Sequence, residues 1–375
     1  MRDRSLRHRL PLLVFLGAAL LLGVALLGCG GNQSPMSPQS SDVGTSAVAM
    51  RADNPEFRAA MAVQDRHTNA LIDMEEVVAV GTGLNENGRP AVVVYTVSKL
   101  PAGRLPLTLE GIPVIEEVSG RIVAMKGPGG SGNHQAPQTP PIQLGTSGGS
   151  AQDLANGFCC SGTLGALVAK GSTQYILSNS HVFAGDVVSG GNGRTSQIGD
   201  DVTQPGLIDA NCQASQTLIV ADVSTLSTTF PPNSTPNVDC SIAQVRAGMV
   251  RTDGSILGVG TISSSTVAAS VGQAVKKSGR TTGLTRSTVN SINVTVQVGY
   301  TDECAGGSYT KTYTGQIFVN NRRFLQGGDS GSLMVEDVTT NPRAVGLLFA
   351  GSSSIAVANP IGSVLSHLGA TMVGN

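Results

Sequence analysis

Apolar and polar positions divide the chain into an apolar leader, a short mixed segment and a long series of brief apolar runs. An unbroken apolar run covers residues 10–27, and a Gly/Pro/Ser-rich stretch covers 127–150. Beyond that stretch, short runs rich in Val, Thr and Ile alternate with Gly, Ser and Pro, a pattern typical of an all-β domain. Residues 127–150 are therefore predicted to be a linker, and 151–375 a β domain.

The segment before the linker mixes two periodicities. Residues 55–74 carry apolar positions at helical spacing behind an Asn-Pro pair at 54–55, which is a helix start signal. Apolar runs at 77–84 and 91–97, joined by a turn that contains Asn-Gly, predict a β-hairpin. Residues 55–126 are thus predicted to form a small α/β domain.

A candidate nucleophile stands in the segment 326–332, Gln-Gly-Gly-Asp-Ser-Gly-Ser. Glycines on either side let Ser330 sit on a tight turn whose backbone N–H groups converge on one point, as in an oxyanion hole. A hydroxyl is a weak nucleophile until a base takes its proton, so a histidine is required elsewhere. Taken alone, the motif also fits an ordinary surface loop.

Histidine is scarce, which narrows the choice of base. His181 ends the apolar strand pattern 175–183 and precedes Ser330 within the β domain. The other histidines lie in the leader, upstream of the β domain or near the C-terminus: His8, His67, His134 and His367. His181 is therefore the predicted general base, against the alternative of a packed structural histidine.

The acid that orients the base is predicted to be Asp239, which opens the apolar run 237–243 and is thereby held away from water. The order His, Asp, Ser along the chain is that of chymotrypsin. Other acids between His181 and Ser330 remain alternatives, namely Asp200, Asp201, Asp209 and Asp222.

Three motifs together resemble those of the chymotrypsin-fold (trypsin-like) serine proteases. They are 177–182 (Leu-Ser-Asn-Ser-His-Val), 238–243 (Val-Asp-Cys-Ser-Ile-Ala) and 328–332 (Gly-Asp-Ser-Gly-Ser). Further segments resemble a bacterial branch related to the plant Narrow Leaf 1 type: 162–168, 204–206, 278–285 and 345–352. The resemblance covers roughly residues 142–375 and implies two antiparallel β-barrels with the site in the cleft between them.

Carried over residue by residue, the resemblance makes His181 the base, Asp239 its orienter and Ser330 the nucleophile. The N–H groups of Gly328 and Ser330 would be the oxyanion donors. Two departures stand out: Ser-Asn-Ser replaces the common Thr-Ala-Ala before the histidine, and Cys240 follows the acid. Neither removes a catalytic atom.

The resemblance also implies which residues form the substrate pocket. The residue six positions before the nucleophile lies at the base of the primary pocket in this fold, and here it is Phe324. The strand that contains Gly351 would form the pocket wall and pair with the substrate backbone. Without a carboxylate at its base, the pocket is expected to favour small or apolar residues. The alternative is that Phe324 belongs to the core.

The leader predicts export. Arginines precede the apolar run, and the run ends in Ala-Leu-Leu-Gly-Cys, which resembles a bacterial lipobox with Cys29 as the lipidated residue. Residues 1–28 are then a signal peptide and 29–54 a lipidated tether, which places the protein at the bacterial cell envelope (the outer membrane if Gram-negative). An ordinary secretory signal and an uncleaved anchor helix remain alternatives.

Composition excludes several other classes. A net charge of −1 with 13% charged residues leaves no basic surface for nucleic acid. No Cys-x-x-Cys pair is present, so no metal and no cofactor are expected. Apart from Cys29, five cysteines remain, enough for two disulfides of open connectivity.

These observations predict a lipid-anchored serine endopeptidase that acts on protein or peptide substrates through an acyl-enzyme. The competing hypothesis is a protease-like scaffold that binds peptides or partners without turnover. The oligomeric state is left open by the sequence.

Overall fold

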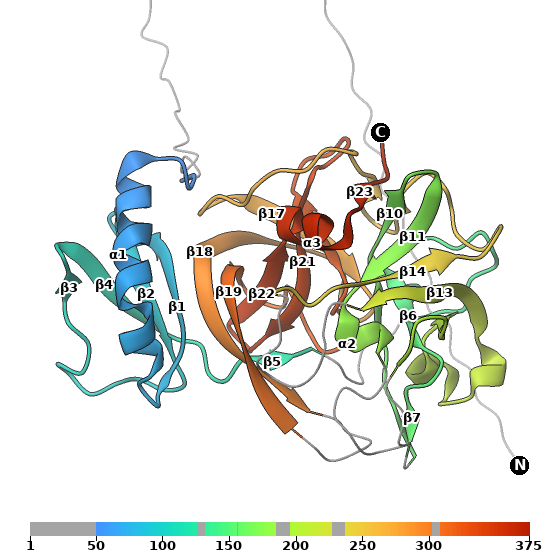
Figure 1. The fold of residues 1–375 in the computed structure, drawn as a ribbon, viewed down its shortest axis with the longest axis horizontal. Helices are drawn as coiled ribbons and strands as arrows, with labels where there is room; N and C mark the ends of the chain where they lie inside the picture. The colour runs from blue at the N-terminus through green and yellow to red at the C-terminus, as the bar shows by residue number, and fades with distance from the viewer. Residues whose placement is uncertain (1–49, 126–131, 156, 185–195, 227–236, 302–307) are drawn as a thin grey trace, which may run out of the picture. The chain divides into compact units, whose positions relative to one another are not determined.

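The computed structural model describes residues 50–125, 132–155, 157–184, 196–226, 237–301 and 308–375. Strands dominate these residues, and most of them belong to two large, curled sheets (Figure 1). The prediction of a mainly β fold is confirmed. Alternating apolar residues of the strands fill the space that each curled sheet encloses, which is why short Val- and Ile-rich runs fold in this way.

Six strands of the larger sheet close into an antiparallel barrel, called here the second barrel. β18 pairs with β17 as well as with β19, so the order β17-β20-β21-β22-β19-β18 returns to its start. The strands are β17 (Ala274–Gly279), β18 (Gly283–Thr301), β19 (Ser308–Asn320), β20 (Leu333–Glu336), β21 (Ala344–Gly351) and β22 (Ile355–Pro360).

The smaller sheet, called the first barrel, has the order β23-β10-β11-β14-β13-β12-β6-β9. β9 leads through Gly165 directly into β10, and the N–H of Gly165 donates to the carbonyl of Leu177 at 2.9 Å. The two ends of this sheet are thereby brought together. Its strands are β6 (Thr146–Ser150), β9 (Gly162–Leu164), β10 (Ala166–Lys170), β11 (Thr173–Ser178), β12 (Asp201–Gln204), β13 (Leu218–Leu226), β14 (Ser241–Val245) and β23 (Thr371–Met372).

The segment predicted as a small α/β domain continues the sheet of the second barrel. β1 pairs antiparallel with β18, with Ala79 opposite Val296. Its own strands are β1 (Val77–Leu84), β2 (Pro90–Thr96), β3 (Thr108–Leu109) and β4 (Ile112–Val118). The predicted division at residue 126 stays a prediction, but the described residues 55–125 share backbone hydrogen bonds with the barrel that follows them.

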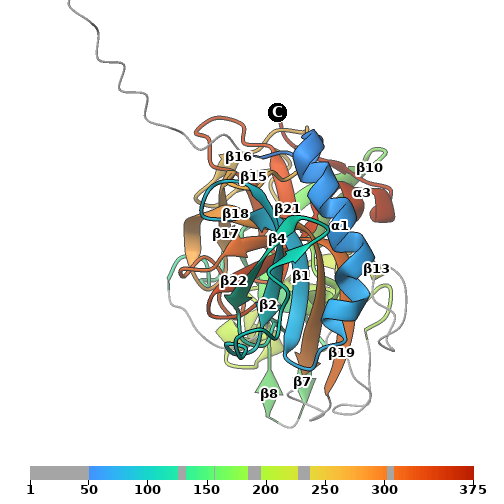
Figure 2. The ribbon, with the colours of Figure 1, turned by 90° about the vertical axis from the view of Figure 1, so that its left-hand side faces the viewer.

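Helix α1 (Pro55–Ile72) lies across β1 and β2 (Figures 1 and 2). The predicted cap is confirmed, because the Asn54 side chain accepts hydrogen bonds from the N–H groups of Glu56 and Phe57. The predicted hairpin is also present as β1 and β2. Buried Gln64 ties the helix to the barrel by donating to the Asn293 carbonyl at 3.1 Å.

The remaining described elements are short. They are α2 (Ser180–Phe183), α3 (Ile361–Leu368), the 3₁₀ helices η1 (Leu207–Ala210) and η2 (Ala214–Gln216), and the strands β5 (Val123–Ala124), β7 (Leu154–Ala155), β8 (Phe158–Cys159), β15 (Ser255–Ile256) and β16 (Gly260–Thr261). No helix in the described ranges combines the length and apolar character needed to cross a membrane.

One disulfide joins Cys159 to Cys212 and closes a loop of the first barrel. Cys160 and Cys240 are buried and lie outside this bond. The structure therefore shows one of the disulfides whose connectivity the sequence left open. Cys29 and Cys304 lie outside the described residues.

Candidate active site

The predicted base, His181, and its predicted acid, Asp239, lie at the ends of two neighbouring strands. β11 ends at Ser178, which stands opposite Ser241 at the start of β14. The chain beyond β11 turns at once into α2, and Asp239 lies two residues before β14. This register brings the Nδ1 atom of His181 within 2.6 Å of the Oδ2 atom of Asp239.

Asp239 is fully buried, and its carboxylate accepts hydrogen bonds on both oxygens. Oδ1 accepts from the backbone N–H groups of Ser180 at 2.8 Å and of His181 at 3.3 Å. Oδ2 accepts from the Tyr300 hydroxyl at 2.9 Å as well as facing His181. Burial raises the pKa of Asp239, but the charge of His181 and these hydrogen bonds outweigh it, so the pKa lies below its usual value.

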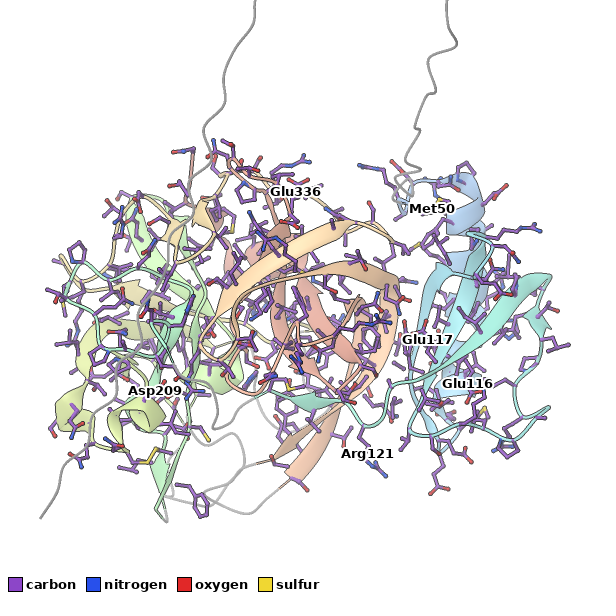
Figure 3. The ribbon with its side chains drawn as sticks, turned by 180° about the vertical axis from the view of Figure 1, so that it is seen from behind. Met50, Glu116, Glu117, Arg121, Asp209 and Glu336 are labelled. Carbon is purple, nitrogen blue, oxygen red and sulfur yellow. A yellow bond between two sulfur atoms is a disulfide. The ribbon has the colours of Figure 1, made fainter. Side chains whose placement is uncertain are left out.

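The other acids considered from the sequence have different partners. Asp200 accepts from the backbone N–H of Gln197, while Asp201 and Asp222 both pair with Arg246. Asp209, labelled in Figure 3, pairs with the nearly buried Arg280 at 2.6 Å. Each of these carboxylates is accounted for by a turn or an ion pair. Of the five acids, Asp239 is the one whose side chain contacts His181.

Ser330 is buried, and its hydroxyl has a partner other than the histidine. Its Oγ atom donates to the carbonyl oxygen of Phe349 in β21 at 3.0 Å. His181 Nε2 is buried and has no hydrogen-bond partner among the described residues. The structure therefore brings His181 and Asp239 together and leaves the serine hydroxyl turned to β21.

Close packing nevertheless sets the serine turn against the element that carries His181. Gly331, with φ of +90°, lies so close to β11 that a Cβ atom there would be 2.2 Å from the Ser178 Oγ. Only glycine fits this conformation and this space. In addition, the N–H of Thr163 donates to the Ser330 carbonyl at 2.8 Å, which joins β9 of the first barrel to the turn.

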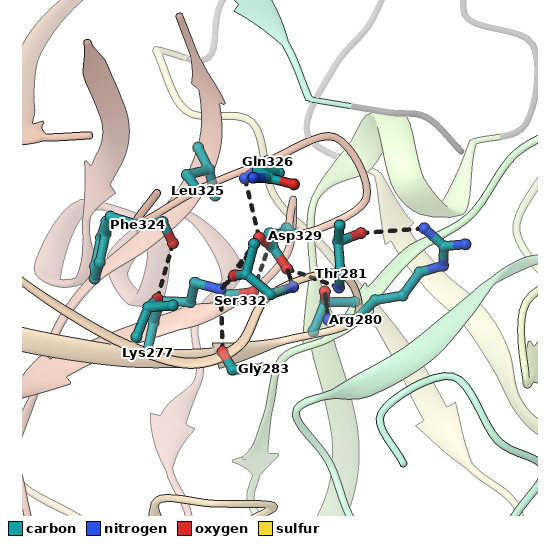
Figure 4. A network of polar contacts seen from close by, with 12 residues as sticks. Lys277, Arg280, Thr281, Gly283, Phe324, Leu325, Gln326, Asp329 and Ser332 are labelled. Carbon is teal, nitrogen blue, oxygen red and sulfur yellow. Dashed lines mark hydrogen bonds and ion pairs between the residues drawn. The ribbon is translucent and has the colours of Figure 1, made fainter. Parts of the chain in front are cut away.

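Asp329, the residue before Ser330, anchors the turn by a buried ion pair (Figure 4). The Asp329 carboxylate lies 3.2 Å from the Lys277 ammonium, and both side chains are fully buried. Oδ1 also accepts from the N–H groups of Thr281 and Thr282 at 2.9 and 3.1 Å. Burial lowers the pKa of Lys277, and the charge of Asp329 opposes that shift. Removing either partner would leave an uncompensated buried charge.

The predicted oxyanion donor Gly328 is directed at a peptide carbonyl. Its φ is +92°, and its N–H donates to the carbonyl oxygen of Met125 at 2.8 Å. Of the predicted pocket residues, Gly351 is the last residue of β21 and is buried. The Phe324 side chain is 1% exposed and belongs to a buried apolar cluster with Leu348. Phe324 thus contributes to the core, the alternative noted from the sequence.

Two contacts in the candidate site were not found from the sequence. Tyr300 lies near the end of the Val-rich strand β18, and the barrel's curvature brings its hydroxyl to Asp239. Its ring packs edge-on to His181, with centroids 5.9 Å apart. Lys277 stands in β17, where a lysine normally marks a solvated face. The one signal for it was an acid directly before the nucleophile, which needs a counter-charge if buried.

Comparisons with known proteins give partial matches. Residues 216–358, less than half of the chain, match the family model described as the Nal1 C-terminal domain. The chain is similar to the solved structure of a glutamic acid specific serine protease that utilizes a histidine triad in substrate binding (21% identity, TM-score 0.40, 62% of this chain and 100% of that one).

Two further solved structures are similar at lower identity. They are Thermobifida fusca protease A (20%, TM-score 0.38, 62% of this chain and 99% of that one) and Cellulomonas bogoriensis chymotrypsin (18%, TM-score 0.36, 62% and 99%). These neighbours are serine proteases of the chymotrypsin fold. Comparison with curated proteins finds no match.

The Tyr300 contact yields a prediction about stability and pH. Tyr300→Phe should lower the free energy of unfolding at pH 7 by about 2 kcal/mol, because a hydrogen bond to a charged group contributes about 1.5–3 kcal/mol. The folded pKa of Asp239 is depressed, so its stabilising contribution is present above the unfolded value of about 3.9 and is lost as pH falls through the folded pKa. The deficit of Tyr300→Phe should therefore shrink between pH 7 and pH 3 in urea titrations.

Tyr313→Phe is the matched control. Because the single hydroxyl proton of Tyr300 goes to Asp239, Tyr313 donates to Tyr300 at 2.7 Å and does not touch the carboxylate. Its loss should therefore cost about 1 kcal/mol at either pH. A Tyr300→Phe deficit that is equally independent of pH would contradict the contact with Asp239.

Proposed function

We propose that this chain is a serine endopeptidase of the trypsin-like class. The observation that carries the proposal is the buried His181–Asp239 pair. His181 contacts Asp239 through Nδ1, and its other ring nitrogen, Nε2, has no hydrogen-bond partner among the described residues. Buried polar atoms are nearly always hydrogen-bonded, and exceptions concentrate where chemistry takes place. An imidazole nitrogen kept open beside a serine turn is suited to accept a proton.

The proposed mechanism assigns a role to each contact. Rotation about the Cα–Cβ bond of Ser330 turns Oγ from the Phe349 carbonyl towards His181 Nε2. Oγ then attacks the substrate carbonyl as His181 takes the proton, and the Gly328 N–H stabilises the oxyanion. Asp239 holds the ring in the tautomer that accepts at Nε2. The protonated His181 then gives its proton to the leaving amine, and water releases the acyl group.

A non-catalytic scaffold is the second candidate. The observation that favours it is the hydrogen bond from Ser330 Oγ to the Phe349 carbonyl, which engages the hydroxyl away from His181. A binding protein of this kind would hold peptides on β21 without turnover. The two candidates differ in whether Ser330 reacts as a nucleophile.

Labelling with a fluorophosphonate probe distinguishes them. We expect the purified full-length chain to be labelled at Ser330, identified by mass spectrometry of the modified peptide. The reaction should be followed over hours, because Ser330 is buried and an irreversible adduct collects molecules that open only transiently. Ser330→Ala should abolish labelling, and Asp239→Asn should slow it by several orders of magnitude.

Ser354→Ala is a suitable control. Ser354 is exposed and lies three residues beyond the end of β21, so its substitution should leave labelling intact. Labelling of the Ser330→Ala variant at the wild-type rate would contradict the proposed nucleophile. A folded wild-type chain that never reacts would favour the scaffold.

We further propose that the enzyme is a lipid-anchored envelope protein of the bacterial branch related to the Narrow Leaf 1 type. Support comes from the leader, in which residues 1–28 would be removed and Cys29 acylated. The segment 29–54 is rich in Ser, Gly and Pro and has no long apolar run, so membrane retention would depend on the acyl chains.

The Cys29→Ala variant should therefore be neither acylated nor retained in the membrane fraction. Metabolic labelling with a fatty-acid analogue, followed by cell fractionation, measures both, with Ser34→Ala in the tether as the control that keeps them. Equal membrane retention of Cys29→Ala would instead indicate an uncleaved anchor helix at residues 10–27.

A further inference from the structure

The chain places one of its own segments along the strand proposed to bind substrate. β5 pairs antiparallel with β21, with Ala124 opposite Ala350 and Val123 opposite Gly351. The ladder continues one step further, because the N–H of Met125 donates to the Phe349 carbonyl at 3.2 Å. Residues 122–125, called here the cleft segment, therefore run antiparallel along β21 up to the nucleophile.

The carbonyl of Met125 occupies the position of a reacting carbonyl. The Gly328 N–H, proposed as an oxyanion donor, points at this oxygen from 2.8 Å. Ser330 Oγ and the Met125 N–H both donate to the single Phe349 carbonyl oxygen. The nucleophile thus lies beside the backbone of Met125 while the oxyanion donor already holds that residue's carbonyl.

The side chains of residues 122–124 alternate between protein and solvent, as in a bound extended peptide. Ile122 is 2% exposed and packs in a buried cluster with Phe349, whereas Val123 is 42% exposed. Met125 turns back inward and packs against the apolar cluster that contains Phe324. Its Cε atom lies 3.0 Å from where a Cβ on Gly351 would stand.

The surroundings of the Met125 side chain are therefore apolar: Gly351 lies on one side and the cluster that contains Phe324 lies behind it. An ammonium or guanidinium group buried here would find no counter-charge at Gly351 or in the apolar core cluster that contains Phe324, and the desolvation cost would disfavour it. A flexible unbranched side chain such as methionine fills an irregular apolar space well. The cleft segment itself thus indicates the class of residue that this pocket accepts.

We propose that the cleft segment is the chain's own first substrate and that Met125 is the residue after which the chain cleaves itself. The inference rests on the proposed protease function and adds to it a specific bond and a preference for unbranched apolar residues. Residues before the cut would stay bound after cleavage, because β1 remains hydrogen-bonded to β18 and Phe57 is buried in the barrel's cluster. The connection that leads to the segment passes Arg121 (Figure 3).

The step balances without any co-reactant other than water. Ser330 Oγ bonds to the Met125 carbonyl carbon while its proton passes to His181. The bond from that carbon to the nitrogen of residue 126 breaks, and His181 returns the proton to the amine that leaves. Water then releases Met125 as a carboxylate and restores the serine. Residue 126 itself lies outside the described residues.

Self-cleavage is tested by expressing the full chain and its Ser330→Ala variant, with intact-mass analysis and N-terminal sequencing. The wild type should yield a fragment that begins at Lys126, and the two pieces should elute together on size exclusion. Ser330→Ala should remain a single uncut chain. Cleavage of Ser330→Ala at the same bond would mean that another protease cuts there and would overturn the proposal.

The assignment of Met125 as the residue before the cut is tested by comparing a charged with an apolar substitution at this position. Met125→Lys should slow self-cleavage at least about tenfold, whereas Met125→Leu should retain it. Val118→Lys introduces the same charge on the exposed end of β4, outside the cleft segment, and should be processed like the wild type. Equal processing of Met125→Lys, or a cut after another residue, would overturn the assignment.

Fluorophosphonate labelling separates failure of this inference from failure of the proposed function. A wild-type chain that is labelled at Ser330 but stays uncut would overturn self-cleavage and leave the protease proposal standing. A chain that is neither labelled nor cut would contradict both. An uncut Met125→Lys variant that is still labelled would support the inference, because its catalytic machinery is then intact.

Discussion

The buried carboxylate of Asp239 is the interaction on which the site depends. A charge removed from water costs several kcal/mol unless hydrogen bonds replace its hydration. Here the first barrel supplies the backbone donors and the histidine ring, and the second barrel supplies the hydroxyl of Tyr300. The acid is therefore satisfied only when both barrels are folded and in contact, so assembly of the fold and orientation of the base are one event.

A second buried charge, that of Asp329, has the same structural role for the turn that carries Ser330. Asp329 is neutralised by Lys277 and held by the backbone of the segment after β17, which fixes the turn that presents Ser330 and the Gly328 N–H. The two carboxylates lie on opposite sides of the proposed reaction: one orients the base, and the other shapes the oxyanion site. Both use rigid, buried pairs, which is what preorganised electrostatic catalysis requires.

Local signals made much of this arrangement predictable. The Asn54 cap, the β1–β2 hairpin and the strand-ending His181 each depend on neighbours within a few residues. The contacts that escaped prediction are non-local. Tyr300 reaches Asp239 only through barrel curvature, and Phe324 lies in the core because its cluster is assembled from distant strands.

The pairing of β1 with β18 and of the cleft segment with β21 belongs to the same class of non-local contact. Both depend on strand register across more than two hundred positions of sequence, which no local pattern encodes. The resemblance predicted that Gly351 and its strand form the wall of the substrate pocket, and this stays a prediction. It gave no sign that the chain's own residues 122–125 lie there.

The central claim is that Ser330, His181 and the Gly328 N–H form one reactive centre, and that the substrate backbone pairs with β21 beside it. The most direct measurement is a crystal structure of the full chain after reaction with a peptidyl phosphonate that carries a methionine side chain. The account predicts a phosphorus–Oγ bond at Ser330, a phosphonyl oxygen at the Gly328 N–H and the inhibitor backbone on β21 in place of residues 122–125. An unmodified Ser330 in an otherwise folded protein, with the inhibitor absent from β21, would contradict it.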